Sequence, residues 1–115
     1  MSKITIYHNN RCSKSREALA LLEERNLDPE VRYYLKDAPS TTEITDLLKK
    51  LNMKPEDLIR KKETIYKENF KGKDLTEDEW ITILSENPRL IERPIVINGD
   101  KAAVGRPTEN IEEIL

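Results

Sequence analysis

The chain has 115 residues and a mass of 13.4 kDa, which predicts a single domain over residues 1–115 with one modest core. Charged residues make up 37% of the chain but balance to a net charge of −2, which excludes a general affinity for nucleic acid. No stretch approaches the roughly 18 apolar residues of a membrane span. Met1–Lys3 leads directly into a strand pattern, so we expect no signal peptide. We therefore expect a soluble, cytoplasmic protein.

The first third of the sequence predicts a β-α-β unit. Apolar and polar residues alternate over residues 3–7, which indicates a short strand. Good helix formers with apolar residues at helical spacing predict a helix over residues 13–25. A second alternating run predicts another strand over residues 31–35. The alternating positions of that strand are Val31, Tyr33 and Leu35.

The middle of the sequence predicts a block of short helices. Ser40–Glu43 and Thr76–Glu79 both have the spacing of a capping box, and apolar residues follow each at helical spacing. Pro55 suits the first turn of a further short helix. The charged stretch over residues 61–73 has a weak pattern that predicts one helical turn on a solvated face or loop.

The end of the sequence predicts a β-hairpin and a final helix. Residues 93–97 and 101–104 have strand composition, and Asn98–Gly99 between them is a hairpin turn signal. Pro107 suits the start of the last helix, which predicts a trans peptide bond before it. The order β-α-β, helical block, hairpin, helix predicts an α/β protein with a mixed four-stranded sheet, compatible with a thioredoxin-like fold.

The only cysteine, Cys12, lies between the first strand and the first helix, at or next to the helix N-cap. Free backbone N–H groups and the helix dipole there favour a thiolate and a lowered pKa. The same N–H groups can hold an oxyanion. Nearby residues add positive charge or hydroxyl donors: Arg11, Lys14 and Arg16, and Ser13 and Ser15. These features predict a sulfur nucleophile beside an anion site, whereas the alternative is an inert, buried cysteine.

The only histidine, His8, is four residues before Cys12 and is a second candidate catalytic residue. It could hydrogen-bond a loop residue, help to deprotonate the thiol, or hold the loop in shape. One cysteine and one histidine make a poor metal site, so we expect no metal. Ser15 occupies the place of the second sulfur in a Cys-x-x-Cys motif, so any disulfide must form with an outside thiol.

Four separated motifs resemble the glutaredoxin-coupled arsenate reductase family. They are His8-Asn9 with Cys12 and Ser15-Arg16, Arg60 after a short Leu-Ile helix, Arg93-Pro94-Ile95-Val96, and Gly105-Arg106-Pro107. The resemblance runs from Ile4 to the C-terminal helix, and a housekeeping member of the family would also fit. It implies a thioredoxin-like fold with the helical block inserted between the second strand and the hairpin.

The resemblance also implies a mechanism. Cys12 attacks arsenate, and Arg60, Arg93 and Arg106 hold the oxyanion, with Ser15 as a further donor. Guanidinium groups suit this task because they stay charged and donate two parallel bonds. Glutathione and glutaredoxin would supply the electrons, without a bound cofactor. The resemblance further implies a cis peptide bond between Arg93 and Pro94.

Two features keep other functions open. The family commonly has proline where Asn10 stands, so the active loop is expected to be less rigid. The same fold family includes Spx-like redox regulators that bind RNA polymerase, often through Cys-x-x-Cys; the lack of a second cysteine favours the reductase. A single-cysteine thiol oxidoreductase with another substrate is the remaining alternative.

Overall fold

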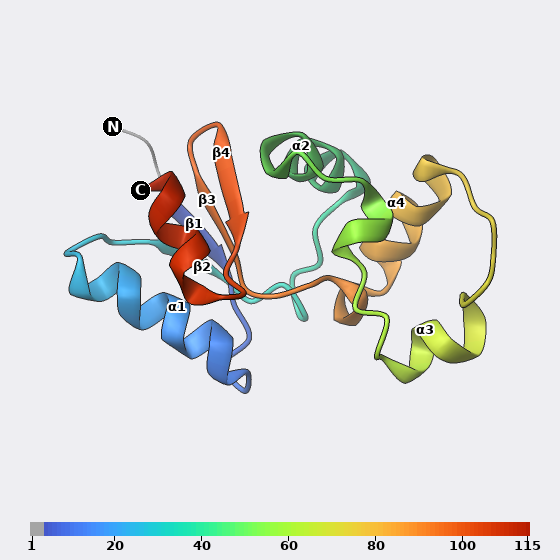
Figure 1. The fold of residues 1–115 in the computed structure, drawn as a ribbon, viewed down its shortest axis with the longest axis horizontal. Helices are drawn as coiled ribbons and strands as arrows, with labels where there is room; N and C mark the ends of the chain where they lie inside the picture. Colours follow the sequence, from blue (N-terminus) through green and yellow to red (C-terminus); the bar gives the residue numbers. More distant parts are fainter. Residues whose placement is uncertain (1–3) are drawn as a thin grey trace. The chain divides into compact units, whose positions relative to one another are not determined.

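The computed structural model describes residues 4–115, which form two compact units (Figure 1). Within these residues, unit 1 comprises residues 4–37 and 93–115, and unit 2 comprises residues 38–92. Two expectations lie outside the described residues: the strand start at Lys3, and the absence of a signal peptide at Met1–Lys3. The single domain over residues 1–115 stays a prediction. No helix of the described chain is long and apolar enough to cross a membrane.

Unit 1 contains the mixed four-stranded sheet that the sequence predicts, and in the described residues its strand order is β2-β1-β3-β4. Its strands are β1 (Ile4–Tyr7), β2 (Glu30–Arg32), β3 (Ile95–Asn98) and β4 (Lys101–Val104). Strand β1 pairs in parallel with β2 and antiparallel with β3, which in turn pairs antiparallel with β4. The end of β1, the start of β3 and the end of β4 therefore lie at the same edge of the sheet.

Two local predictions in unit 1 are wrong in detail. Strand β2 ends at Arg32, because a turn begins in which the Tyr33 carbonyl accepts hydrogen bonds from the Lys36 and Asp37 N–H groups. Tyr34 is buried there and stacks on Tyr7 at 6.3 Å, whereas Tyr33 and Leu35 are 50% and 39% exposed. The alternation over residues 31–35 therefore does not continue as a strand.

The hairpin turn lies one residue later than predicted. Asn98 is the last residue of β3 and pairs with Lys101, so the connecting residues are Gly99 and Asp100. Gly99 has the positive φ of 64° that favours glycine at the first turn position. The Asn98 side chain instead donates to the Ile114 carbonyl, at 2.6 Å, and ties the C-terminal helix to the strand.

One face of the sheet is covered by helix α1 (Ser13–Glu24) and by the C-terminal 3₁₀ helix η3 (Thr108–Ile114). Fully buried Ala18 and Leu22 form one face of α1, as the helical spacing predicts. They pack into the core of unit 1, whose buried members are Ile4, Ile6, Ala18, Leu22, Val96 and Ile111. This packing fixes the start of α1, where Cys12 lies, against the edge of the sheet.

Unit 2 is the predicted helical block. Its elements are α2 (Thr41–Leu51), η1 (Pro55–Leu58), α3 (Thr64–Asn69), α4 (Glu77–Glu86) and η2 (Pro88–Leu90). Both predicted capping boxes are confirmed, because Ser40 and Thr76 each accept from the N–H of the glutamate three residues later. Helix α3 is the predicted turn in the charged stretch.

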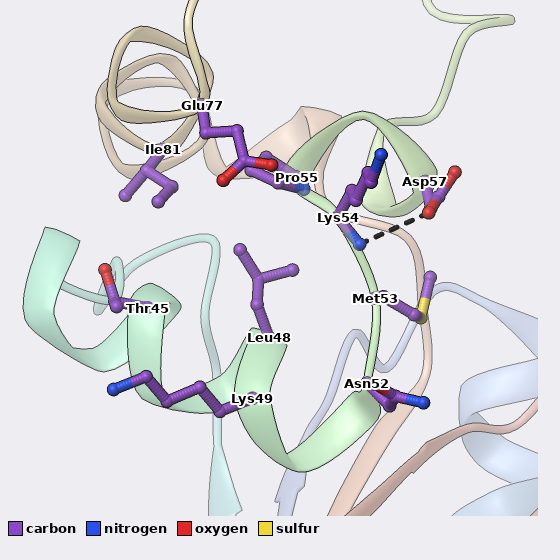
Figure 2. A pocket seen from close by; sticks show the side chains of 10 residues that line it. All are labelled: Thr45, Leu48, Lys49, Asn52, Met53, Lys54, Pro55, Asp57, Glu77 and Ile81. Atoms are coloured by element: carbon purple, nitrogen blue, oxygen red, sulfur yellow. Dashed lines mark hydrogen bonds between the residues drawn. The ribbon is translucent and has the colours of Figure 1, made fainter.

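A pocket of about 500 Å³ opens on unit 2 beside α2, η1 and α4 (Figure 2). Leu48 and Ile81 point into it, and Glu77 and Lys49 stand at its margin. It holds neither cysteine nor histidine, since the only examples of both residues in the chain belong to unit 1.

Candidate active site

Cys12 is the N-cap residue of α1, with the extended backbone of a residue that precedes a helix. Its N–H donates to the Asn9 carbonyl at 3.0 Å, and its own carbonyl accepts from the Arg16 N–H at 3.0 Å. The side chain is 8% exposed. The sulfur therefore lies at the positive end of the helix, as the sequence predicts.

The surroundings of the sulfur favour its ionised form. Burial raises the pKa of the Cys12 thiol, but the Ser15 N–H, the Arg93 charge and the Lys14 N–H outweigh it, and the pKa falls below its ordinary value. Hydrogen bonding from the Arg93 side chain acts in the same direction. A lowered pKa beside fixed positive charge is typical of a reactive cysteine, whereas the burial of Cys12 is what the inert alternative expects, so its catalytic role stays a prediction.

Arg93 and Arg106 reach Cys12 because they flank the hairpin at the sheet edge that also ends β1. Arg106 Nη2 is 3.8 Å from Cys12 Sγ, and Arg106 Nε donates to the Arg93 carbonyl at 2.7 Å. Arg93 Nε is buried and makes no hydrogen bond to any described residue. It is therefore a buried donor whose hydrogen bond is not satisfied by the described residues.

The residues next to these arginines hold the two loops together. The Gly105 N–H donates to the Pro94 carbonyl at 2.8 Å. A Cβ on Gly105 would lie 2.9 Å from both Pro94 and Ile111, so a larger residue there would force these side chains to shift. The predicted cis bond before Pro94 is confirmed, whereas the trans bond predicted before Pro107 is wrong, since that bond is also cis. The prediction assumed that Pro107 opens the helix, but Pro107 is the N-cap residue and η3 begins at Thr108.

His8 and Ser15 form a buried pair behind the loop. His8 Nδ1 is 2.6 Å from Ser15 Oγ, and both side chains are buried. Ser15 Oγ also accepts from the Asn9 N–H at 3.0 Å. Burial and the charge of Arg16 lower the pKa of His8, which therefore favours the neutral ring. The pair joins the end of β1 to the first turn of α1, which matches the loop-holding role considered for His8.

Arg60 belongs to unit 2. Its backbone N–H donates to the Leu90 carbonyl at 2.7 Å, and its Nη1 lies 3.4 Å from both Glu63 Oε1 and the Arg89 carbonyl. Its predicted role at the oxyanion, like the roles of the other predicted site residues, stays a prediction.

Arg16 makes a contact with the loop that was not predicted from the sequence. Arg16 Nη1 donates to the Asn10 carbonyl at 2.9 Å and so ties the first turn of α1 to the loop before Cys12. The sequence feature that could have indicated this contact is the position of Arg16 one helical turn after Cys12, since residues i and i+4 lie on one helix face.

Comparisons with known proteins show which family and structures this chain is similar to. The model of the ArsC family matches residues 7–114. The "Uncharacterized protein YfgD" of Escherichia coli is 46% identical, with 98% of this chain and 97% of that protein covered. The "Arsenate reductase" of Haemophilus influenzae is also 46% identical, with 97% and 98% covered. A solved structure, "Arsenate reductase from Vibrio cholerae", superposes with a TM-score of 0.95 at 43% identity, over 99% of this chain and 98% of that one.

Proposed function

This chain belongs to the ArsC family, and from that premise we propose that it reduces arsenate to arsenite with Cys12 as the nucleophile. The observation that carries the proposal is the position of the Cys12 sulfur, at the start of α1 and 3.8 Å from Arg106 Nη2. A thiolate and an oxyanion are both negative, so attack of one on the other needs fixed positive charge close to both groups. Arg93 and Arg106 provide this charge within unit 1.

The first step is attack of the Cys12 sulfur on arsenic. A sulfur–arsenic bond forms, one arsenate oxygen leaves as water with the thiol proton and a proton of the oxyanion, and arsenic stays As(V). We propose that Arg60, Arg93 and Arg106 hold the remaining oxygens. The buried Arg93 Nε–H, which has no partner among the described residues, is one donor for them.

The second step is reduction by glutathione. The glutathione sulfur attacks the Cys12 sulfur, a disulfide bond forms, and the electron pair of the sulfur–arsenic bond stays on arsenic. Arsenic is thereby reduced to As(III) and leaves as arsenite, while two thiols are oxidised to one mixed disulfide. A glutaredoxin thiolate then attacks the glutathione sulfur and releases the Cys12 thiolate. Thiols supply both electrons, so we propose no bound cofactor or metal.

Ser15 and His8 take supporting parts in this proposal. The Ser15 hydroxyl is fully buried and hydrogen-bonded to His8. The backbone N–H of Ser15, which favours the Cys12 thiolate, is therefore a better placed donor to the oxyanion than the hydroxyl. We further propose that residues 1–115 act as one domain. A cytoplasmic location fits, because that compartment keeps thiols reduced.

The test is NADPH oxidation coupled through glutathione reductase, glutathione and glutaredoxin. We expect arsenate to start NADPH consumption. Phosphate is the matched control, because it has the same shape and charge but is not reduced by thiols, and it should leave NADPH consumption at background. Cys12→Ser should reduce the arsenate-dependent rate to background, while Lys101→Ala, at the opposite end of the sheet, should keep it. A rate that survives Cys12→Ser would refute the mechanism. Turnover of glutathionylated substrates alone would favour a thiol oxidoreductase with another substrate.

A further inference from the structure

A groove of about 540 Å³ lies beside the loop that carries Cys12, entirely within unit 1. One side is formed by residues 8–11, and the other by the turn after β2. The volume falls in the range of about 300–1,000 Å³ that is usual for small-molecule sites. Neither Arg93 nor Arg106 lines it, so it is separate from the place proposed for the oxyanion.

The turn side of the groove carries two exposed large hydrophobic side chains. Of the described residues, the large hydrophobic side chains that are exposed are Tyr33, Leu35 and Leu115. Two of these three line this one groove. The Tyr33 ring also packs edge-on against His8, with 5.8 Å between ring centroids. Exposed apolar side chains are common singly, but their concentration beside a reactive loop indicates a ligand surface.

The charge of the groove selects the kind of ligand. Its charged lining residues are Arg11 and Lys36, and no carboxylate lines it. The nearest acid in sequence, Asp37, has its carboxylate 3.5 Å from Arg32 Nε. An occupant therefore needs negative charge for the two cations and an apolar or peptide part for Tyr33 and Leu35.

We propose that this groove is the subsite for the thiol reductant, a small anionic peptide thiol of the glutathione class. The identity of the reductant rests on the function proposed above. Its carboxylates lie against Arg11 and Lys36, and its backbone crosses Leu35 and Tyr33. An extended tripeptide spans about 10 Å. Since Arg11 is the residue before Cys12, the thiol on the central residue of such a peptide lies beside the loop that carries the Cys12 sulfur.

The test uses a reaction that needs no arsenate. The Cys12 thiolate attacks glutathione disulfide, which yields the Cys12–glutathione mixed disulfide and one glutathione thiolate; mass spectrometry follows the product. Hydroxyethyl disulfide, which is uncharged and undergoes the same exchange, serves as the probe without carboxylates. The variants are Lys36→Glu and Leu35→Ser. The matched control is Lys101→Glu, which makes the same charge change at the opposite end of the sheet.

We expect Lys36→Glu to slow the reaction with glutathione disulfide at least about fivefold, on the order of the effect of one close charge pair. The reaction with uncharged hydroxyethyl disulfide should stay within about 1.5-fold of the wild-type rate. Leu35→Ser should slow the glutathione reaction about threefold, on the order of a partly lost apolar contact. Lys101→Glu should change neither rate. Equal slowing of both disulfides, or no slowing by Lys36→Glu, would overturn the proposal.

Arsenate turnover separates this proposal from the proposed function. If the glutathione reaction depends on Lys36 but arsenate is not reduced, the subsite holds and the proposed function fails. If arsenate is reduced and Lys36→Glu leaves the KM for glutathione unchanged, the proposed function holds and the subsite fails. If Lys36→Glu raises only the KM for glutaredoxin, the groove belongs to a protein partner and the proposal is overturned.

Discussion

The buried Ser15 hydroxyl offers the sharpest test of how the active loop is held. Ser15→Ala removes the partner of two groups, the Asn9 N–H at 3.0 Å and His8 Nδ1 at 2.6 Å. A buried polar group without a partner costs about 1–3 kcal/mol, and the Asn9 N–H is only partly buried, so we expect a loss of about 2–3 kcal/mol in the free energy of unfolding. Urea denaturation followed by far-UV circular dichroism measures this loss.

Ser13→Ala is the matched control, because Ser13 lies in the same helical turn and is exposed. Alanine favours the helix equally at both positions, so the difference between the two variants isolates the buried hydrogen bonds. A Ser15→Ala loss within about 0.5 kcal/mol of the control, the usual range for surface changes, would refute the reasoning.

The same variant also tests the single-domain prediction. Trp80, the only tryptophan, lies in unit 2, while Ser15 lies in unit 1. If residues 1–115 unfold as one domain, Trp80 fluorescence and circular dichroism should shift together in Ser15→Ala. A fluorescence transition that stays at its wild-type midpoint would show that the two units unfold separately.

Three further predictions concern the loop. Arg93→Met should raise the pKa of Cys12 because a nearby positive charge is lost. The rate of Cys12 alkylation by iodoacetamide at pH 7 should therefore fall, and the pH profile of alkylation should move to higher pH. An unchanged pH profile would show that Arg93 does not lower the pKa of Cys12. The pKa of His8 is lowered in the folded protein, so the unfolded chain binds more protons below the ordinary value of 6.5. Stability should therefore fall as the pH drops from 6.5, and His8→Asn should flatten this slope in urea denaturation. Asn10→Pro should shift the free energy of unfolding by no more than about 1 kcal/mol in urea denaturation and should leave the alkylation rate of Cys12 within about threefold. A larger change in either quantity would contradict this prediction.

Local chemistry explains what the sequence could predict. The capping boxes at Ser40 and Thr76 and the position of Cys12 before α1 depend on neighbours within four residues, and all three are found as expected. The core face of α1 follows from helical spacing alone. Such features are visible in one stretch of chain, so a single sequence suffices to predict them.

Burial from distant parts of the chain explains what the sequence could not predict. The run over residues 31–35 alternates like a strand, but Tyr34 is the buried residue because it stacks on Tyr7, 27 positions earlier. The approach of Arg106 to Cys12 depends on the hairpin register, which brings the end of β4 to the edge where β1 ends. Taken singly, an arginine is usually a surface residue, so the family resemblance was needed to single it out.

The departure at Asn10 shows how the loop can be ordered without the family proline. Three hydrogen bonds of the loop are made by Asn9, through its N–H, its side-chain oxygen and its carbonyl. The partners are Ser15 Oγ, the Arg11 N–H and the Cys12 N–H. A fourth bond joins the Asn10 carbonyl to Arg16. None of the four uses the Asn10 N–H, which a proline would lack, so proline would add only a fixed φ to a loop already held at both ends. The hydrogen bond from the Cys12 N–H to Asn9 therefore orders the loop next to the sulfur without a proline at position 10. The sulfur keeps its place at the start of α1.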